Sequence, residues 1–251
     1  MPSPYEVPAL RRARDVLDIL ARACAPVRVT TLVQQTGLSR STLYLLLDSL
    51  AACRWIEKRN DGYIVGLKLF ELGSTYVRHD GLQPAFRLEA SAFIAAHNEV
   101  VQLGVLDQLE VVYIAREDAQ RPVRLVSDLG VRLPAHCCAL GKALLGSLPD
   151  DKLVVLLPER LASLTARTTT RRGALLAELA DVRKRGIATE YEEVSTGLAC
   201  IASYVGVTPS GKRVAVSTSV PLERLTVRRE KQLTTAVARV ASRIAERMMR
   251  G

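Results

Sequence analysis

The segment of residues 29–65 constrains this chain more than any other, because its helix and turn signals follow one another in a fixed order. Val29–Thr36 has the composition of a short helix, and Gly37 is the residue type that ends a helix in a left-handed conformation. Ser39 then offers a side-chain oxygen to the unpaired backbone N–H groups at the start of a second helix. Two helices joined by a tight glycine turn are typical of a helix-turn-helix.

The second of these helices is predicted to have a buried side and an exposed side. Apolar residues recur at the spacing of a buried helical stripe, namely Leu43, Leu46, Leu47 and Leu50. Leu38 and Leu43 flank the cap as a hydrophobic staple, which fixes the angle at which the chain joins the helix. Short polar and basic side chains lie toward the other side, as in a helix that reads a DNA groove. The predicted DNA-binding residues of the two helices are Thr30, Ser39, Arg40, Ser41, Thr42 and Tyr44, and the last four of these are the best candidates for groove contacts.

A β-hairpin is predicted directly after these two helices. Residues 55–58 and 63–65 are short strand-like runs, and Asn60-Asp61-Gly62 between them supplies residue types that tolerate positive φ. A hairpin in this place is a wing, and Lys58 and Arg59 near its tip are placed to meet phosphates. The alternative is a helical hairpin followed by a β-hairpin with no role in DNA binding.

The charge of the chain permits DNA binding but does not establish it. The 251 residues carry a formal net charge of +9 at pH 7. Residues 1–80 hold 11 Lys or Arg against 8 Asp or Glu, whereas residues 224–250 hold 8 against 2. Much of the positive surplus therefore lies outside the helix-turn-helix segment. The basic C-terminal segment is expected to be a solvated helix face, with an acidic surface of a partner subunit as the alternative contact.

Hydropathy and cysteine usage limit the class of protein. No apolar run approaches the ~18 residues needed to span a bilayer, and residues 1–4 lack the charged and apolar regions of a signal peptide. The 5 cysteines form no CxxC pair, and the 3 histidines show no metal-ligand spacing. A cytoplasmic protein with free thiols, and with neither a metal nor a cofactor, is the expectation.

Three regions are predicted: a winged helix-turn-helix domain at residues 1–66, a linker helix at 67–80, and a larger second domain at 81–251. The first domain opens with a helix at 10–22 whose buried side is expected to hold Leu10, Ala13, Leu17 and Leu20. In the second domain, strands are predicted at 100–106, 110–116, 123–127, 187–190, 198–205 and 213–220. Helices are predicted at 83–97, 137–148, 150–157, 171–185 and 226–249. This interleaving favours an α+β fold on a mainly antiparallel sheet.

Two segments of the second domain carry candidate chemistry. Residues 130–145 place His136 before a helix with small residues in its first turn, so its free backbone N–H groups can attract a carboxylate or phosphate. Residues 186–202 place an acidic cluster before a strand that begins at a glycine. The cluster consists of Glu190, Glu192 and Glu193, which can act as paired acids, although a solvated turn is the plainer interpretation of Glu192.

With these motifs in place, the chain resembles the IclR-type transcriptional regulators, named for the isocitrate lyase regulator, over essentially its whole length. The matching residues are 36–42 with Leu46-Leu47 and the wing, Leu133-Pro134 with His136 and Gly141-Lys142-Ala143, and Glu192-Glu193 with Gly197 and Cys200-Ile201-Ala202. The resemblance implies a winged helix-turn-helix, a linker helix and a GAF-like effector-binding and oligomerisation domain. It also implies a homodimer or homotetramer that binds palindromic operator DNA and a small-molecule effector.

The resemblance assigns the effector-binding residues by position. They are Leu125, Leu133, His136, Cys138, Ala139, Leu140, Glu190, Cys200, Ser217 and Ser219. The backbone of Ala139 and Leu140 would receive a carboxylate, while the two serines would add hydroxyl donors from a facing strand. For His136, packing at the helix start is an equal alternative.

The chain departs from the family pattern at three places. Leu45 stands where arginine is common, so it either contacts a thymine methyl group or weakens the anchoring to phosphate. Cys137-Cys138 replaces the small residues usual before the pocket helix. Glu190 stands where aspartate is more frequent, and it reaches one methylene further into the site.

Two other classes of protein remain open at this point. Cys137 and Cys138 lie near a helix start, where the pKa of a thiol falls, so a thiol redox sensor or an enzyme with a cysteine nucleophile are alternatives. The plainer interpretation treats both as small pocket or core residues, because adjacent side chains on a helix diverge. We favour a regulator that is not an enzyme, a repressor whose effector is a small organic acid, aromatic acids included.

Overall fold

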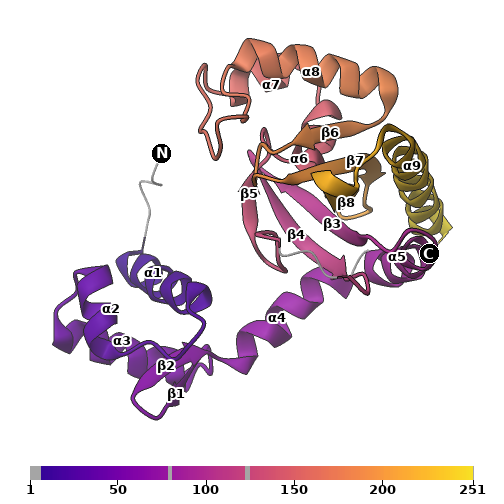
Figure 1. The fold of residues 1–251 in the computed structure, drawn as a ribbon. Coiled ribbons are helices and arrows are strands. Elements are labelled where there is room, and N and C mark those ends of the chain that lie inside the picture. The colour runs from indigo at the N-terminus through magenta and orange to yellow at the C-terminus, as the bar shows by residue number, and fades with distance from the viewer. Residues whose placement is uncertain (1–6, 79–80, 122–124, 251) are drawn as a thin grey trace. The chain divides into compact units, whose positions relative to one another are not determined.

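The computed structural model describes residues 7–78, 81–121 and 125–250 (Figure 1). Contacts within the chain divide it into two units, residues 1–76 and 77–251, and the division falls within helix α4 (Leu67–Arg78). The helix predicted over 67–80 corresponds to α4, and its last two residues lie outside the described part of the chain. Each unit has a hydrophobic core of its own.

The first unit has the predicted order of three helices and a hairpin. Its elements are α1 (Pro8–Arg22), α2 (Val29–Thr36), α3 (Arg40–Ala52), β1 (Ile56–Arg59) and β2 (Gly62–Val65), the two strands being antiparallel. Gly37 ends α2 with a left-handed φ of 67°. The Ser39 side chain accepts a hydrogen bond of 3.3 Å from the backbone N–H of Thr42 and so caps α3. The local signals for the turn and the cap are confirmed.

The buried side of α1 differs from the prediction. Its buried residues are Ala13, Val16 and Leu20. Leu17 is only partly buried and Leu10 is 63% exposed, so the expectation that Leu10 is buried is wrong. Both sets of residues have helical spacing, and spacing alone does not distinguish a face centred on Val16 from one centred on Leu17.

The wing is shaped by a close approach of a third chain segment. The loop residue Asn60 has a positive φ of 42°, whereas Asp61 and Gly62 do not. Gly62 lies in β2, and a Cβ there would sit 2.8 Å from the carbonyl carbon of Pro26. The adjoining Val27 exchanges two backbone hydrogen bonds of 2.9 Å with Tyr63. Glycine is therefore required at position 62 because residues 26 and 27 pack against the hairpin.

The second unit is built on a six-stranded antiparallel sheet with the order β5-β4-β3-β8-β7-β6. Its strands are β3 (Val100–Asp107), β4 (Glu110–Glu117), β5 (Arg132–Pro134), β6 (Ala188–Tyr191), β7 (Leu198–Val207) and β8 (Arg213–Pro221). Its helices are α5 (Leu82–His97), α6 (Ala139–Gly146), α7 (Asp150–Leu156), α8 (Arg172–Arg185) and α9 (Val227–Arg250), with a 3-10 turn η1 (Leu222–Arg224). The predicted α+β fold is confirmed.

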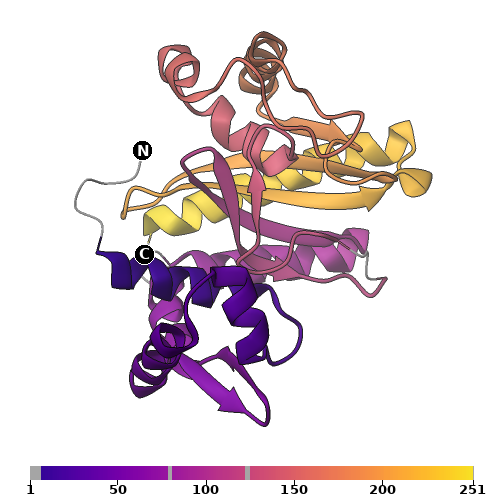
Figure 2. The ribbon, with the colours of Figure 1, turned by 90° about the vertical axis from the view of Figure 1, so that its left-hand side faces the viewer.

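The helices cover both faces of the sheet (Figures 1 and 2). α5 and α9 lie side by side on one face, where Phe86 and Ile244 are fully buried. α6 and α8 lie on the other face, around Leu144 and Leu179. The functional candidates of the second unit all lie near the face that α6 covers.

Two predicted elements of the second unit need correction. Residues 125–127 are not a strand, and residues 123 and 124 lie outside the described part of the chain. The strand that pairs with β4 is β5, in which Leu133 is opposite Val111. With three residues ending at a proline, it is too short for an alternating pattern to reveal. The helix predicted from Cys137 begins at Ala139, because Cys138 has extended backbone geometry as the N-cap.

No helix within the described residues has an apolar stretch long enough to cross a membrane.

Candidate functional site

A small cavity lies between the sheet of the second unit and the first turn of α6. Its volume is about 20 Å³, enough for about one water molecule. Every predicted effector-binding residue except His136 lines it, namely Leu125, Leu133, Cys138, Ala139, Leu140, Glu190, Cys200, Ser217 and Ser219. The structure thus brings together residues from four strands, one helix and one loop.

Other lining residues were not predicted from the sequence. They are Gln102, Tyr113, Val126, Ser127, Val194, Ser195 and Leu198. Gln102 could have been identified from the sequence, because it is a polar residue in an otherwise apolar run. In the structure its side chain is almost fully buried. A buried amide needs partners, which makes such a residue a candidate for a polar site.

Gln102 links the two walls of the cavity. Its Nε2 donates to the carbonyl and the Oγ of Ser127, at 2.9 and 2.8 Å. Its Oε1 accepts a hydrogen bond of 3.4 Å from the Oγ of Ser219, which also lies 3.2 Å from the Sγ of Cys200. Polar groups of three neighbouring strands are therefore already connected around the cavity.

The first turn of α6 presents backbone donors to the cavity. The first N–H groups of a helix have no partner within it, and the side chain of the N-cap Cys138 does not bond them among the described residues. The first turn holds no acidic side chain. Ala139 and Leu140 therefore provide N–H groups at the positive end of a helix, an arrangement that binds carboxylate or phosphate oxygens.

Glu190 is a buried acid in the lining of the same cavity. Its side chain is 2% exposed, and its Oε2 accepts a hydrogen bond of 2.9 Å from the backbone N–H of Glu193. Burial raises the pKa of the Glu190 carboxyl, although hydrogen bonds from Cys200 and the Glu193 backbone act in the other direction. A raised pKa favours the protonated form of the carboxyl, which can donate a hydrogen bond as well as accept one.

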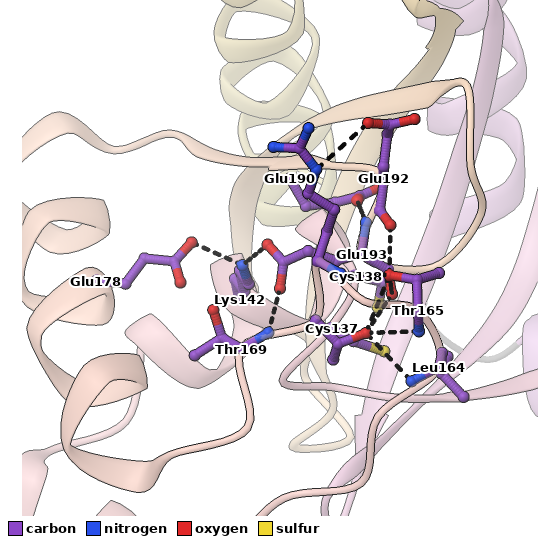
Figure 3. Close-up of polar contacts among 12 residues, drawn as sticks. Cys137, Cys138, Lys142, Leu164, Thr165, Thr169, Glu178, Glu190, Glu192 and Glu193 are labelled. Carbon is purple, nitrogen blue, oxygen red and sulfur yellow. Dashed lines mark hydrogen bonds and ion pairs between the residues drawn. The ribbon is translucent and has the colours of Figure 1, made fainter.

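A buried ion cluster lies beside the cavity (Figure 3). Lys142 of α6 is fully buried, and its Nζ donates to Oε1 of Glu178 at 2.7 Å and to the carboxylate of Glu193. Burial lowers the pKa of Lys142, but the two glutamates outweigh it, so the pKa lies above its ordinary value. The Lys142 charge is thus neutralised by the protein itself.

The loop that carries Glu193 is held by a second loop (Figure 3). The Glu193 Oε2 accepts a hydrogen bond of 3.1 Å from the Thr169 N–H, and its carbonyl accepts one of 2.7 Å from Thr168. Thr165 donates to the Glu192 carbonyl at 2.6 Å. Because Glu192 also accepts from the Gly197 N–H at 2.8 Å, it is part of an ordered turn and not a freely solvated one.

The cysteines beside α6 are not activated thiols. Cys137 is buried and donates a hydrogen bond of 3.1 Å to the Pro134 carbonyl. Burial raises the pKa of the Cys137 thiol, and it raises that of Cys138 to about 12. The expectation of a lowered thiol pKa is wrong, because loss of water outweighs the effect of the helix end. Both residues are neutral thiols near pH 7.

His136 lies outside the lining of the cavity. It is buried, and its Nε2 lies 2.8 Å from the carbonyl oxygen of Ala162. This contact joins the loop before α6 to the loop between α7 and α8. The placement fits the packing alternative for His136.

The predicted DNA-contacting residues of the first unit lie on α2, on α3 and its N-cap, and on the hairpin. The exposed residues among them are Thr30, Ser39, Arg40, Ser41, Tyr44, Lys58 and Arg59. Thr42 is half-buried, and its Oγ1 accepts a hydrogen bond of 2.9 Å from Ser39. Arg59 forms an ion pair of 2.7 Å with Glu57. Leu45, which is 71% exposed, adds an apolar group to the same surface.

No cluster of histidine, cysteine or acidic side chains with the arrangement of a metal site occurs within the residues described by the structure.

The two units together define a class of protein: a winged helix-turn-helix joined to an α+β domain with a small cavity at a helix N-terminus. The IclR helix-turn-helix domain model matches residues 9–60. The model described as the bacterial transcriptional regulator IclR C-terminal domain matches residues 75–246. The chain belongs to the IclR family of DNA-binding transcriptional regulators.

Relatives and solved structures agree with this membership. The chain is 30% identical over 252 residues to the HTH-type transcriptional regulator KdgR of Escherichia coli strain K12, covering 98% of this chain and 94% of that protein. The structure of Thermotoga maritima IclR is 25% identical, with a TM-score of 0.77 and coverage of 95% of this chain and 98% of that one. An IclR homologue from Microbacterium hydrocarbonoxydans complexed with 4-hydroxybenzoate has the same fold, with 21% identity, a TM-score of 0.84 and coverage of 97% and 100%.

Proposed function

We propose that the protein is an effector-responsive transcriptional repressor whose second unit binds a small organic acid in the cavity at α6. The observation that carries this proposal is the pair of backbone N–H groups of Ala139 and Leu140, which line the same cavity as the buried Glu190. The helix end binds the carboxylate of the acid, and Glu190, Ser217 and Ser219 bind its polar substituent.

The cavity must expand when this acid binds. At about 20 Å³ it holds a water molecule and not an organic acid. The wall near Ser127 is held by neutral hydrogen bonds from Gln102 and by one of 3.1 Å from the Arg116 guanidinium to the Ser127 carbonyl. The wall near Val194 is anchored through a buried ion pair at Glu193. A hydrogen bond is worth about 1 kcal/mol between neutral groups and about 1.5–3 kcal/mol when one group is charged. Both values lie below the about 3–5 kcal/mol of a broken buried ion pair, so we expect the Ser127 side to yield first.

An aromatic hydroxy acid is one effector that suits this arrangement. The relative from Microbacterium hydrocarbonoxydans was solved with 4-hydroxybenzoate, a molecule with a carboxylate at one end and a hydroxyl at the other. In this chain the α6 end offers donors for the first group, and Glu190 offers an acceptor for the second.

The thiol-based alternatives are weaker on chemical grounds. A nucleophile or redox sensor needs an accessible thiolate. Cys137 and Cys138 are buried and have raised pKa values. We therefore propose that the protein is not an enzyme and that these thiols are part of the packing around the cavity.

DNA binding as a symmetric homodimer or homotetramer completes the proposal. Arg40, Ser41 and Tyr44 would contact the groove, and Lys58 and Arg59 the flanking phosphates. Exposed apolar side chains on α4, such as Phe70 at 72% exposure, provide surface for a second copy. The protein would act in the cytoplasm, where operator DNA is available to it.

The test uses thermal unfolding of the full chain with a panel of monocarboxylic acids that includes benzoate and 4-hydroxybenzoate. A ligand at a hundred times its Kd raises the free energy of unfolding by about 2.7 kcal/mol and so raises Tm. Ser217→Ala with Ser219→Ala should weaken binding about tenfold by removing two donors. Arg185→Gln, on α8, is the control. If no acid raises Tm, or if the serine variant binds like the wild type, the proposed site is incorrect.

A further inference from the structure

A second concave surface is formed by residues of α5 and α9, helices that pack against each other on the face of the sheet opposite α6. We call it the α5–α9 groove. One end of it is a cavity of about 540 Å³ lined by His97, Arg229, Lys231, Gln232, Ala236 and Arg239. A smaller cavity of about 120 Å³ continues from there, sharing His97 and Arg239 and ending near Arg243.

The charge of this groove is not balanced locally. Lys231 and Arg239 are exposed and form no ion pair among the described residues. The larger cavity has no acidic residue in its described lining. Helix α9 places these two side chains about 12 Å apart along its axis, with the small Ala236 between them.

The nearby acids are already neutralised by other arginines. The buried Glu99 pairs with Arg224 at 3.1 Å and with Arg229 at 3.4 Å. The buried Glu89 pairs with Arg243 at 3.4 Å and with Arg247 at 2.9 Å. Each glutamate meets two arginines. Because Glu246 also lies beside Arg243 and Arg247, the positive surplus remains at the Glu99 pair.

The two helix ends do not cancel this surplus. Arg229 donates to the backbone carbonyl of His97 and so occupies a carbonyl at the negative end of α5. The cavity also lies near the first turns of α9, the positive end of that helix. Burial, followed by the charges of Arg229 and Arg239, lowers the pKa of the His97 imidazole, which is consistent with a positive potential at this point.

We propose that the α5–α9 groove is a binding site for phosphate-type oxyanions that carry at least two negative charges, with Lys231 and Arg239 as the principal ligands. Guanidinium groups bind such oxyanions through paired hydrogen bonds, and the ammonium group of lysine adds a compact charge. A monocarboxylate would leave most of the positive charge unbalanced, which separates this site from the α6 cavity in ligand chemistry. Two sources can supply the phosphate groups: a free phosphorylated metabolite, or the backbone of bound DNA.

The experiment compares two variants of the full chain with equal changes in net charge. Lys231→Gln with Arg239→Gln removes the proposed ligands. Lys152→Gln with Arg185→Gln, at exposed positions on α7 and α8, is the matched control. All four side chains are exposed, so neither variant alters core packing.

The first arm measures binding of inorganic pyrophosphate by calorimetry at constant ionic strength. Saturable binding that weakens at least tenfold in the groove variant and is unchanged in the control supports a free phosphate ligand. The second arm measures the salt dependence of binding to a non-specific DNA duplex. Loss of two phosphate contacts lowers the slope of log K against log[salt] by about 2 for each chain.

A reduced slope in the groove variant alone identifies DNA phosphate as the source. The proposal is overturned if the two variants behave alike in both arms, whether both retain the wild-type values or both lose binding equally. Neither arm depends on the identity of the acid that binds near α6.

Discussion

The recognition helix of the first unit and the cavity of the second unit hold their polar residues in opposite ways. Arg40, Ser41 and Tyr44 lie exposed on α3, where we propose that they contact DNA and where they contribute little to packing. Around the cavity, Gln102, Glu190 and the neighbouring Lys142 cluster are buried, so the same groups hold the fold together. Substitutions should therefore separate function from stability in the first unit and couple them in the second.

The largest effect is expected at the buried lysine. Lys142→Met leaves two carboxylates without their cation, and breaking a buried pair in this way costs about 3–5 kcal/mol of unfolding free energy. Urea denaturation measures this loss. Lys58→Met, on the exposed wing, should change stability by less than about 0.5 kcal/mol.

A compensated variant tests the cause of that loss. Lys142→Met combined with Glu178→Gln and Glu193→Gln removes the unpaired charges and should recover a substantial part of the stability. If the triple variant is no more stable than the single one, uncompensated charge is not the reason for the loss.

On the exposed side of the comparison, Arg40→Ala with Tyr44→Ala should weaken sequence-specific DNA binding by at least tenfold, since lost base contacts cost about 1–3 kcal/mol each. The free energy of unfolding should stay within about 0.5 kcal/mol of the wild type. Fluorescence anisotropy with a selected operator and urea denaturation provide the two measurements. Unchanged specific binding would exclude this helix face as the reading surface.

Glu190→Gln should stabilise the protein at neutral pH. The folded state raises the pKa of Glu190, so between the unfolded pKa, about 4.3, and the folded pKa the folded state binds more protons than the unfolded state. Wild-type stability thus falls as pH rises through this window. The advantage of the glutamine variant is greatest above the window and disappears below it, as urea denaturation from pH 4 to 8 can show.

If the free energies of unfolding of the wild type and of Glu190→Gln change with pH in parallel, folding does not raise the pKa of Glu190. Because the amide introduced by Glu190→Gln retains an oxygen that can accept from the Glu193 N–H, the variant isolates the charge from the hydrogen bond.

The smallest effect is expected at Leu45, which is exposed and adjacent in sequence to Tyr44, one of the proposed groove contacts. Leu45→Arg should add one phosphate contact and steepen the slope of log K against log[salt] by about 0.9. Leu45→Gln, which is uncharged, is the matched control. An equal slope in the two variants would place position 45 away from the DNA backbone.

The difference between the two units also explains what could be predicted from the sequence. The helix-turn-helix depends on local signals such as Gly37 and the Ser39 cap, and those positions are adjacent in the chain. In the second unit, partners lie far apart: Gln102 and Ser127 are separated by 25 residues, and Lys142 and Glu193 by 51. No spacing rule connects such residues before the strand register is known.

The resemblance to a family identified residues that line the cavity, but it did not identify the other lining residues, such as Gln102. It assigned Glu190, Ala139 and His136 to one binding site. Glu190 and Ala139 both line the cavity, whereas the His136 ring lies outside the lining and contacts the Ala162 carbonyl. The sequence also could not show that residues 125–127 are not a strand and that β5 takes the place beside β4. A three-residue edge strand is determined by its partner and not by its own pattern.

Gly141 has a consequence for how the cavity tolerates change. A Cβ at this position would overlap the backbone of Ala135, so α6 rests directly against the chain segment that precedes it. Because glycine has no Cβ, α6 can take this position, and the position determines the direction of the N–H groups at its first turn. In a saturation mutagenesis library, position 141 should tolerate as few substitutions as a ligand-contacting residue, although it offers a ligand no side chain at all.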